Sequence, residues 1–334
     1  MLPSTPMRVI HSILNPDDLA SLVGLEYEIP APVAATLLRR GFNDTYRARD
    51  AVGRLYALRV YSRDKYWISS DSDLLFELEL LNHLAERGVR VARPLRRRDH
   101  EWLGSLEAPE GRRCFALFTY AEGSPPGERL NLDLRRTLGA EIGRLHQAMD
   151  GFPLKEGRYD LNLDLLVSIP LAAIEAYVDA GQASLFAELQ DVAKDLTDHI
   201  RGLQLPQDAY GLIHGDIHFS NLHVSPAGDL MLFDFDHCGF GWRAYDLTNV
   251  CHVTESASQE EREAALATLE GYESVRKLSD AERESLPVFA ACRILWDTGD
   301  MLRAAHWQGD SWATPSLCER TLSRVRSVLG PVAS

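Results

Sequence analysis

One short stretch, residues 212–247, restricts the possible folds of this chain more than any other part of its sequence. An apolar entry leads into the polar loop 214–221, whose sequence is HGDIHFSN, and a Ser-Pro-Ala-Gly turn then separates two short predicted strands. The second predicted strand delivers Asp234 and Asp236 at its end. We therefore expect a carboxylate and an amide from the loop to lie close to a carboxylate from the strand end.

These groups suit phosphoryl transfer from ATP. Asp216 can accept the proton of an attacking hydroxyl, and the side-chain oxygens of Asn221 and Asp234 can hold magnesium ions. The pattern His-Gly-Asp-x-x-x-x-Asn, followed by a strand that ends in Asp, resembles the catalytic and metal-binding loops of the aminoglycoside phosphotransferase/choline kinase-like family. The resemblance implies ATP and Mg2+ as cofactors, Asp216 as the catalytic base, and Asn221 and Asp234 as metal ligands.

The resemblance also implies an α+β, two-lobed fold of the protein-kinase type. Residues 1–120 would form a small, β-rich, nucleotide-binding lobe, and residues 121–334 a larger, mostly helical, catalytic and substrate-binding lobe. A chain of 334 residues with 45% hydrophobic and 25% charged residues is long enough for two such lobes with ordinary cores.

Local patterns place the elements of this fold. The first part of the chain predicts a short helix beginning at Asn15, a hairpin over 36–61, a helix over 72–86 that stops at Gly88, and strands within 89–95, 101–108 and 113–120. The second part predicts helices within 132–149, 171–200, 258–273 and 280–306, and a final helix from about residue 315.

Candidate nucleotide-binding residues lie in the predicted β-rich lobe. The resemblance places a bend with Gly41 and Asn43 over the nucleotide phosphates, although an ordinary turn accounts for this bend equally well. Arg59 occupies the strand position where the family usually has a lysine that holds the phosphates; arginine keeps the charge but is bulkier and forked. Of two nearby acids, Glu77 matches the family position that pairs with this cation better than Glu79 does.

A strand that breaks into turn residues at 119–123 fits a hinge between lobes. In the resembled fold the adenine edge hydrogen-bonds to hinge backbone, which makes Thr119, Tyr120 and Glu122 candidate cofactor-binding positions.

Further polar residues are expected to support the loop or to contact the substrate. We expect His214 to brace the loop, and Asp246 to brace it from the start of a helix. Asp236 either assists the metal or faces the substrate. Residues on or near the late helices could line the acceptor pocket, although an aromatic stripe is more often core: Arg293, Trp296, Asp297, Asp300, Trp307 and Trp312.

Composition narrows the possible partners and location. The net charge of −14 argues against nucleic acid as a partner, and no apolar run approaches the length of a membrane span. The five cysteines are scattered and never spaced as CxxC, so we expect free thiols and a cytoplasmic protein.

Two other nucleotide-binding motifs are rejected. The segment 239–244 fits the loose dinucleotide pattern GxGxxA, but two aspartates precede it and no repeated βαβ unit surrounds it. The P-loop pattern GxxxxGK[ST] does not occur.

The preferred interpretation is an ATP- and magnesium-dependent phosphotransferase acting on a small-molecule hydroxyl of the aminoglycoside, homoserine or choline type. The alternative is a Ser/Thr protein kinase of the stress-response type, which keeps the same loop. Two less favoured alternatives are a non-catalytic nucleotide-binding scaffold, suggested only by Arg59, and a metal-dependent phosphohydrolase built on the alternating acids and histidines His214, Asp216, His218, Asp234, Asp236 and His237.

Overall fold

The structure, a computed structural model, describes residues 7–63, 65–126, 131–153, 158–254, 256–314 and 316–329. The chain divides into two compact units. The N-terminal unit extends to residue 86 and includes residues 91–121, and the C-terminal unit comprises residues 87–90 and the chain from residue 122 onward. Strands dominate the first unit and helices the second, which is the α+β class expected from the sequence.

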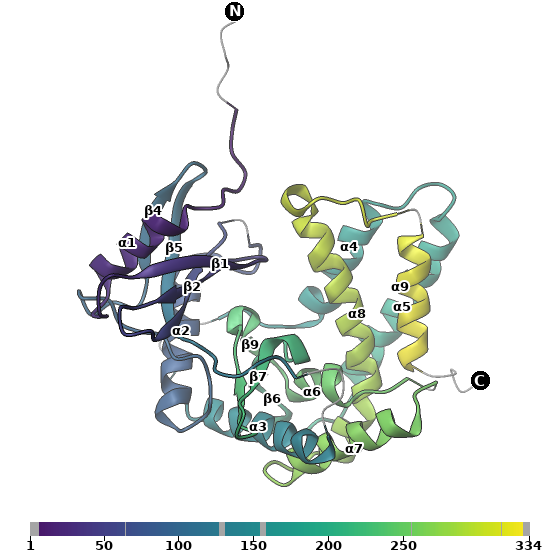
Figure 1. Cartoon of the computed structure of the whole chain (residues 1–334). Coiled ribbons are helices and arrows are strands. Elements are labelled where there is room, and N and C mark those ends of the chain that lie inside the picture. The colour runs from purple at the N-terminus through teal and green to yellow at the C-terminus, as the bar shows by residue number, and fades with distance from the viewer. Residues whose placement is uncertain are drawn as a thin grey trace, which may run out of the picture. The chain divides into compact units, whose positions relative to one another are not determined.

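A five-stranded antiparallel sheet forms most of the N-terminal unit (Figure 1). In sheet order its strands are β1 (Ala34–Arg40), β2 (Asp44–Arg49), β3 (Leu55–Val60), β5 (Gly111–Thr119) and β4 (Gly104–Ala108). Helix α1 (Pro16–Glu26) packs beside β1, and α2 (Asp71–Glu86) follows β3. Side chains at alternate positions of β2 and β3 are buried, and they form a core with residues of α1 and β5.

Most of the elements predicted for this unit are present, with one correction. Asn15 caps α1 by accepting a hydrogen bond from the backbone of Asp17, as its sequence position suggested. Residues 89–95, all of them described, form only isolated bridges instead of the predicted strand. Pro94 pairs with Phe118 of β5 through its neighbours: Leu95 donates to the carbonyl of Leu117 and Thr119 donates to the carbonyl of Arg93, each at 2.8 Å.

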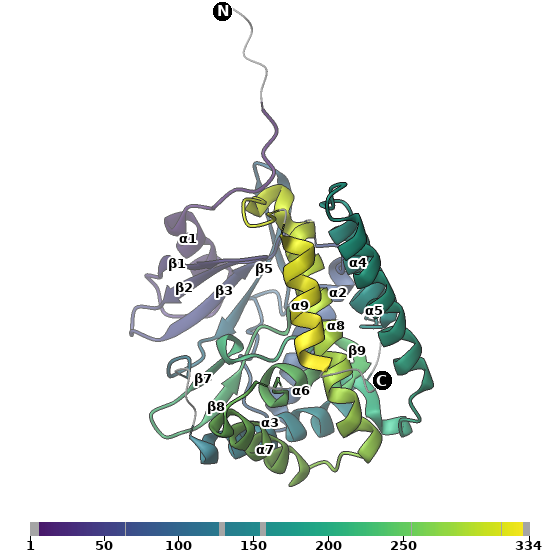
Figure 2. The same cartoon turned by 90° about the vertical axis from the view of Figure 1, so that its right-hand side faces the viewer.

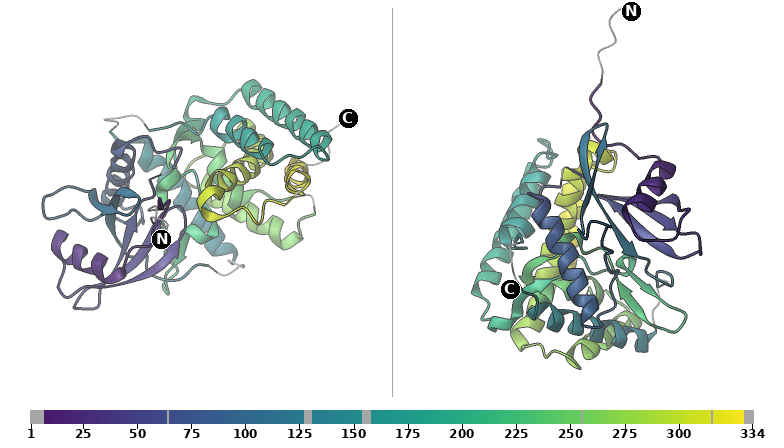
Figure 3. Two further views of the ribbon diagram at one scale, coloured as in Figure 1. Left: turned by 90° about the horizontal axis from the view of Figure 1, so that it is seen from above. Right: turned by 90° about the vertical axis from the view of Figure 1, so that its left-hand side faces the viewer.

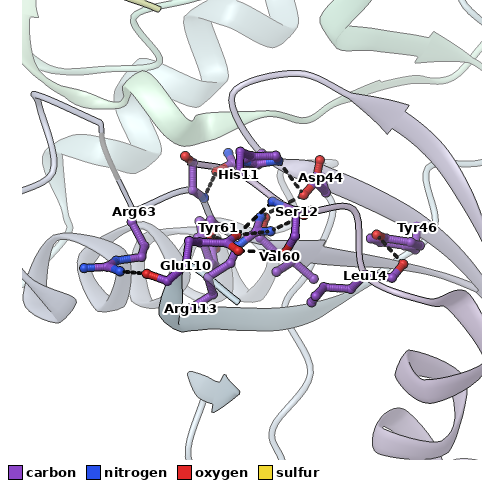
Figure 4. Close-up of polar contacts among 12 residues, drawn as sticks. His11, Ser12, Leu14, Asp44, Tyr46, Val60, Tyr61, Arg63, Glu110 and Arg113 are labelled. Carbon is purple, nitrogen blue, oxygen red and sulfur yellow. Dashed lines mark hydrogen bonds and ion pairs between the residues drawn. The ribbon is translucent and has the colours of Figure 1, made fainter. Parts of the chain in front are cut away.

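The segment before α1 is attached to the sheet by buried charges (Figure 4). Arg113 on β5, whose side chain is 1% exposed, donates to the carboxylate of Asp44 (2.8 Å) and to the backbone carbonyl of Ser12 (3.0 Å). A ring nitrogen of His11 lies 2.9 Å from the same carboxylate, and the Ser12 hydroxyl donates to Glu110 (2.7 Å). Each buried charge therefore faces an opposite charge or a polar group, as burial requires.

The C-terminal unit is built mainly from helices (Figure 2). They are α3 (Leu132–Asp150), α4 (Ile169–Glu175), α5 (Ala183–Gly202), α6 (Arg243–Cys251), α7 (Gln259–Glu273), α8 (Asp280–Gln308) and α9 (Leu317–Leu329), with a π-helical turn at Asp164–Ser168 before α4. Helix α8 packs against α4, α5, α6 and α9, and α3 packs along α7. Seen from above, α8 and α9 lie beside the teal α5 (Figure 3). No helix formed by the described residues is both long and apolar enough to cross a bilayer.

Two small antiparallel pairs carry the motif segment. Strand β6 (Tyr210–Ile213) pairs with β9 (Gly239–Trp242), and β7 (Leu222–Val224) pairs with β8 (Leu230–Leu232). The segment that fits GxGxxA is thus β9 and the start of α6. A dinucleotide-binding unit is built on parallel strands, whereas β9 is antiparallel to β6.

All five cysteines are free and buried, as the sequence suggested. Burial raises the pKa of the Cys114 thiol to about 11 and that of Cys292 to about 12. These thiols therefore stay protonated at neutral pH and are poor nucleophiles.

The α3–α7 contact yields a test of packing. A Cβ added at Gly139 of α3 would overlap the backbone carbonyl of Thr268 of α7. We expect Gly139→Ala to lower the free energy of unfolding by about 1–3 kcal/mol, because this overlap outweighs the better helix propensity of alanine. Urea unfolding measures the change. Gly202→Ala, at the end of α5 with open space around it, is the matched control and should not destabilise the protein.

Candidate active site

The loop 214–221 begins with a conformation that only glycine fits. Gly215 follows β6 with φ of +80°, in the left-handed region, and a Cβ at this position would overlap the backbone carbonyl of His237. The chain therefore turns sharply at residue 215 and brings Asp216 out of the buried strand.

Asp246 on α6 holds the start of this loop. Its two carboxylate oxygens accept hydrogen bonds from the backbone N–H groups of His214 and Gly215, each at 2.7 Å. A ring nitrogen of His146 on α3 lies 3.1 Å from the same carboxylate, and its other ring nitrogen lies 2.9 Å from the hydroxyl of Tyr272 on α7. Asp246 thus contacts the backbone at the start of the loop 214–221.

His214 is fully buried and linked to the loop on both sides. Its Nδ1 accepts a hydrogen bond from the backbone N–H of Asp216 (3.2 Å), and its Nε2 lies 3.2 Å from the carbonyl oxygen of Phe233. These partners fit a neutral ring protonated at Nε2, and burial lowers the pKa of His214. His214 thus links the backbone of Asp216 to that of Phe233.

Asp216 and Asn221 are in direct contact. The Asn221 amide nitrogen donates to the Asp216 carboxylate oxygen Oδ2 (2.9 Å) and to the Asp216 backbone carbonyl (3.0 Å). The Asn221 side chain is buried, and within the described part of the chain its Oδ1 atom has no hydrogen-bond partner. A buried acceptor without a donor is costly, so this oxygen suits a bound cation.

Asp234 follows β8 in an uncommon backbone conformation. Its φ of 67° and ψ of 58° lie in the left-handed region, where non-glycine residues are rare and often occur at functional sites. The preceding residue, Phe233, donates a backbone hydrogen bond to the carbonyl of Asn221 (3.0 Å), so the strand end and the loop are joined at the two predicted metal ligands. Asp236 is buried, and its backbone carbonyl accepts from Arg158 (2.7 Å).

Two basic side chains, those of Arg293 and His218, contact the Asp216 carboxylate. Arg293 of α8 forms an ion pair with its Oδ1, and the Nε2 of His218 lies 3.4 Å from its Oδ2. Burial alone would raise the pKa of Asp216, but Arg293 and then His218 outweigh burial and hold this pKa well below its usual range. Asp216 is therefore a carboxylate at neutral pH and can accept a hydrogen bond from a hydroxyl.

In the N-terminal unit, Arg59 and Glu77 form a pair. The Arg59 guanidinium donates to the Glu77 carboxylate at 2.9 Å, and both side chains are largely shielded from solvent. Asn43 is buried, and its side-chain oxygen accepts from the backbone N–H of Ser62 (3.2 Å). Its amide therefore fixes the bend at 41–43 to the end of β3.

The predicted hinge residues lie at the end of β5. Thr119 is the last residue of this strand, and its hydroxyl accepts from the backbone N–H of Arg93 (2.9 Å). Tyr120 is half-buried, and Glu122 is exposed and is the first residue of the C-terminal unit after the sheet.

Sequence reasoning missed two contacts of the loop. It placed Arg293 among possible pocket residues and did not connect it with Asp216, and it did not connect His146 with Asp246. The partners in these pairs lie 77 and 100 residues apart, and no local pattern reveals such contacts. His218, two residues after Asp216, could have been proposed from its position in the loop. Trp296 is buried and packs edge-on against His237 (4.7 Å between ring centroids), as the core alternative expected.

No group of three or more His, Cys, Asp or Glu side chains within the described ranges is arranged to hold a metal ion on its own. In a kinase the phosphates of the nucleotide complete the coordination shell of the metal, so a few protein oxygens are enough. The α+β fold, with a five-stranded antiparallel sheet followed by a helical unit, is of the protein-kinase type.

Comparison with known proteins identifies the family. Residues 35–278 match the model of the phosphotransferase enzyme family, and the chain belongs to this family. An uncharacterized protein of Deinococcus radiodurans is 38% identical over 312 residues, which cover 92% of this chain and 88% of the relative. A homoserine kinase of Rhizobium meliloti is 29% identical over 293 residues, which cover 84% of this chain and 82% of the relative.

Solved structures of similar fold include two kinases of this kind of architecture. An amicoumacin kinase in complex with AMP-PNP, Ca2+ and Ami has a TM-score of 0.75 and 23% identity, and the match covers 93% of each chain. A microcompartment-associated aminopropanol kinase has a TM-score of 0.73 and 25% identity, with 93% of this chain and 95% of the other covered. The family resemblance inferred from the loop is confirmed, and the chain is a phosphotransferase with a hydroxyl acceptor.

Buried histidines predict how stability depends on pH. Burial lowers the pKa of His146, His214 and His237, the last of them to about 4. In the unfolded chain each takes up a proton near its ordinary pKa of about 6.5. The unfolded state therefore binds more protons below this pH, and stability should fall as the pH falls, by up to about 1.4 kcal/mol per pH unit for each histidine.

Urea unfolding at pH 7, 6 and 5 measures this slope. His237→Gln should make the slope shallower, whereas the same change at the exposed His306 should leave it unaltered. A stability that stays constant or rises from pH 7 to pH 5 would contradict the assignment of neutral buried rings.

Proposed function

We propose that this protein is an ATP- and Mg2+-dependent kinase that phosphorylates a hydroxyl of a small molecule. The observation that carries the proposal is the contact between Asp216 and Asn221. One end of the amide orients the carboxylate, and the other end presents a buried oxygen with no donor among the described residues. A carboxylate base beside a buried oxygen that can bind a metal ion is the arrangement that phosphoryl transfer to a hydroxyl needs.

In the proposed mechanism Asp216 accepts a hydrogen bond from the acceptor hydroxyl and takes its proton as the bond to phosphorus forms. A carboxylate with a lowered pKa is a weak base, so orientation of the hydroxyl is its main contribution. Asn221 fixes the Asp216 carboxylate, and Asp246 fixes the loop from which both side chains project.

Asn221 Oδ1 and Asp234 are the proposed ligands of Mg2+, which when bound neutralises the charge of the nucleotide phosphates. In the N-terminal unit, Arg59 is proposed to contact the phosphates while Glu77 holds its guanidinium in place. Asn43 is proposed to fix a phosphate-binding bend, and the backbone of Thr119, Tyr120 and Glu122 to bind the adenine edge. Asp236 remains a candidate for either metal or substrate contact.

For the acceptor we propose a small amino alcohol of the homoserine or aminopropanol type. Support comes from the similarity to a homoserine kinase and to an aminopropanol kinase, each matched over more than four-fifths of both chains. The net charge of −14 is compatible with an acceptor that carries an ammonium group. The cytoplasmic location expected from the sequence stays a prediction.

The base assignment predicts the effect of one conservative change. Asp216→Asn should lower kcat by about 10²- to 10⁴-fold, because an amide cannot take the hydroxyl proton, and should leave nucleotide affinity within about twofold of the wild type. Transfer is measured with labelled ATP, and affinity by calorimetry. Asp229→Asn, the same change at a half-exposed surface ion pair with Arg90, is the control and should keep full activity. Near-normal turnover by Asp216→Asn would refute the base assignment.

A panel of acceptors tests the substrate class. We expect Mg2+ and ATP to support phosphorylation of homoserine or an aminopropanol in preference to an aminoglycoside, choline or a Ser/Thr peptide. Labelled phosphate on the peptide alone would favour the protein-kinase alternative. Release of phosphate from phosphomonoesters without ATP would favour a phosphohydrolase.

A further inference from the structure

Arg293 makes three polar contacts, two of them at the start of the loop 214–221. It projects from α8, 77 residues after Asp216 in sequence, and one Nη forms the ion pair with Asp216 Oδ1. The other Nη donates to the backbone carbonyl of Gly215 (3.0 Å), and Nε donates to Asp297 Oδ1 (2.8 Å). Because the guanidinium is planar, three bonds in different directions fix both its place and its tilt.

The surroundings of Arg293 leave the guanidinium little freedom. Its side chain is 7% exposed. The guanidinium carbon lies 4.7 Å from the ring centroid of Trp296 and 5.9 Å from that of Tyr245, so aromatic faces cover it. Residues of α8 on both sides are buried, which anchors the helix from which it projects.

The two carboxylate oxygens of Asp216 contact different partners. Oδ1 faces Arg293, whereas Oδ2 faces the Asn221 amide at 2.9 Å and the His218 ring at 3.4 Å. Rotation of the carboxylate would break the ion pair and the amide contact together. His218 Nδ1 accepts from the backbone of Ser220 (3.2 Å), which leaves its Nε2 as the protonated nitrogen.

We propose that Arg293 is a positioning residue for catalysis, which holds the Asp216 carboxylate in the one orientation that presents Oδ2 to the acceptor. The inference rests on the proposed function, since it requires Asp216 to be the base. It assigns to α8 a direct part in the reaction: a shift of this helix moves the guanidinium and, through it, the base. Arg293 itself does not need to touch the nucleotide or the acceptor.

A double-mutant cycle separates positioning from a general structural role. Arg293→Met should lower kcat by about 10²-fold, the loss expected for a misplaced reacting group, while the KM for ATP and the nucleotide affinity stay within about twofold. In an Asp216→Asn background the same change should alter the residual rate by no more than about twofold, because the group through which Arg293 acts is already disabled. Arg293→Lys should recover part of the lost kcat, since it keeps the charge without the fork.

The rates of the cycle are measured with homoserine as the acceptor. They are also measured with water as the acceptor, by following the slow release of phosphate from ATP. Arg97→Met is the matched control. Arg97 also binds a carboxylate, Glu26 (2.6 Å), and a backbone carbonyl, that of Leu103 (3.0 Å), yet it contacts no residue of the loop 214–221 among the described contacts. Arg97→Met should lower the free energy of unfolding about as much as Arg293→Met does, and it should leave kcat unchanged.

A crystal structure of Arg293→Met gives a readout that does not depend on turnover, and we expect the Asp216 carboxylate to be rotated or disordered in it. An Asp216 side chain that keeps its place would overturn the proposal, as would equal losses of kcat in both backgrounds or no loss in the wild-type background. Near-normal turnover by Asp216→Asn alone would instead refute the base assignment within the proposed function, so the two failures are distinguishable.

Discussion

The carboxylate of Asp246 is the point on which the candidate site depends. Two backbone N–H groups at the start of the loop 214–221 and one ring nitrogen of His146 converge on it in a region without solvent. A buried carboxylate is costly unless such donors surround it, so the loop and the acid stabilise each other. The contact joins α3, α6 and the loop after β6, three segments that are distant in sequence, and fixes where the loop begins.

From that fixed start, the geometry of the loop follows in steps. The left-handed turn at Gly215 brings Asp216, whose side chain is 15% exposed, out of the buried strand, and the neutral ring of His214 accepts from the backbone N–H of Asp216 after the turn. Arg293 pairs with the carboxylate of Asp216, and Arg158 donates to the backbone carbonyl of Asp236. Two positions of this segment are thus contacted by arginines that other segments supply.

Much of the fold could be predicted from the sequence because its signals are local. The cap at Asn15, the hairpins of the sheet, and the two strands flanking the turn at 225–228 each arise from neighbouring residues. The contact between Asp216 and Asn221 also follows from spacing within one loop. The segment 89–95 is predicted as a strand, but it pairs with β5 only at an isolated bridge around Pro94.

The interactions that orient the site could not be predicted in the same way. Arg293 projects from α8, which packs against α6, and His146 projects from α3, which packs closely along α7 at Gly139. These contacts come from packing of whole helices, which single-sequence patterns do not encode. The functional roles of Asp216, Asn221 and Asp234 stay predictions that rest on chemistry and position.

The five buried thiols have a practical consequence for following the enzyme at work. Buried native cysteines react slowly with maleimides, so one cysteine introduced on the surface of each unit would be labelled selectively. A donor and an acceptor dye could then report the separation of the two units during turnover, without removal of any natural cysteine.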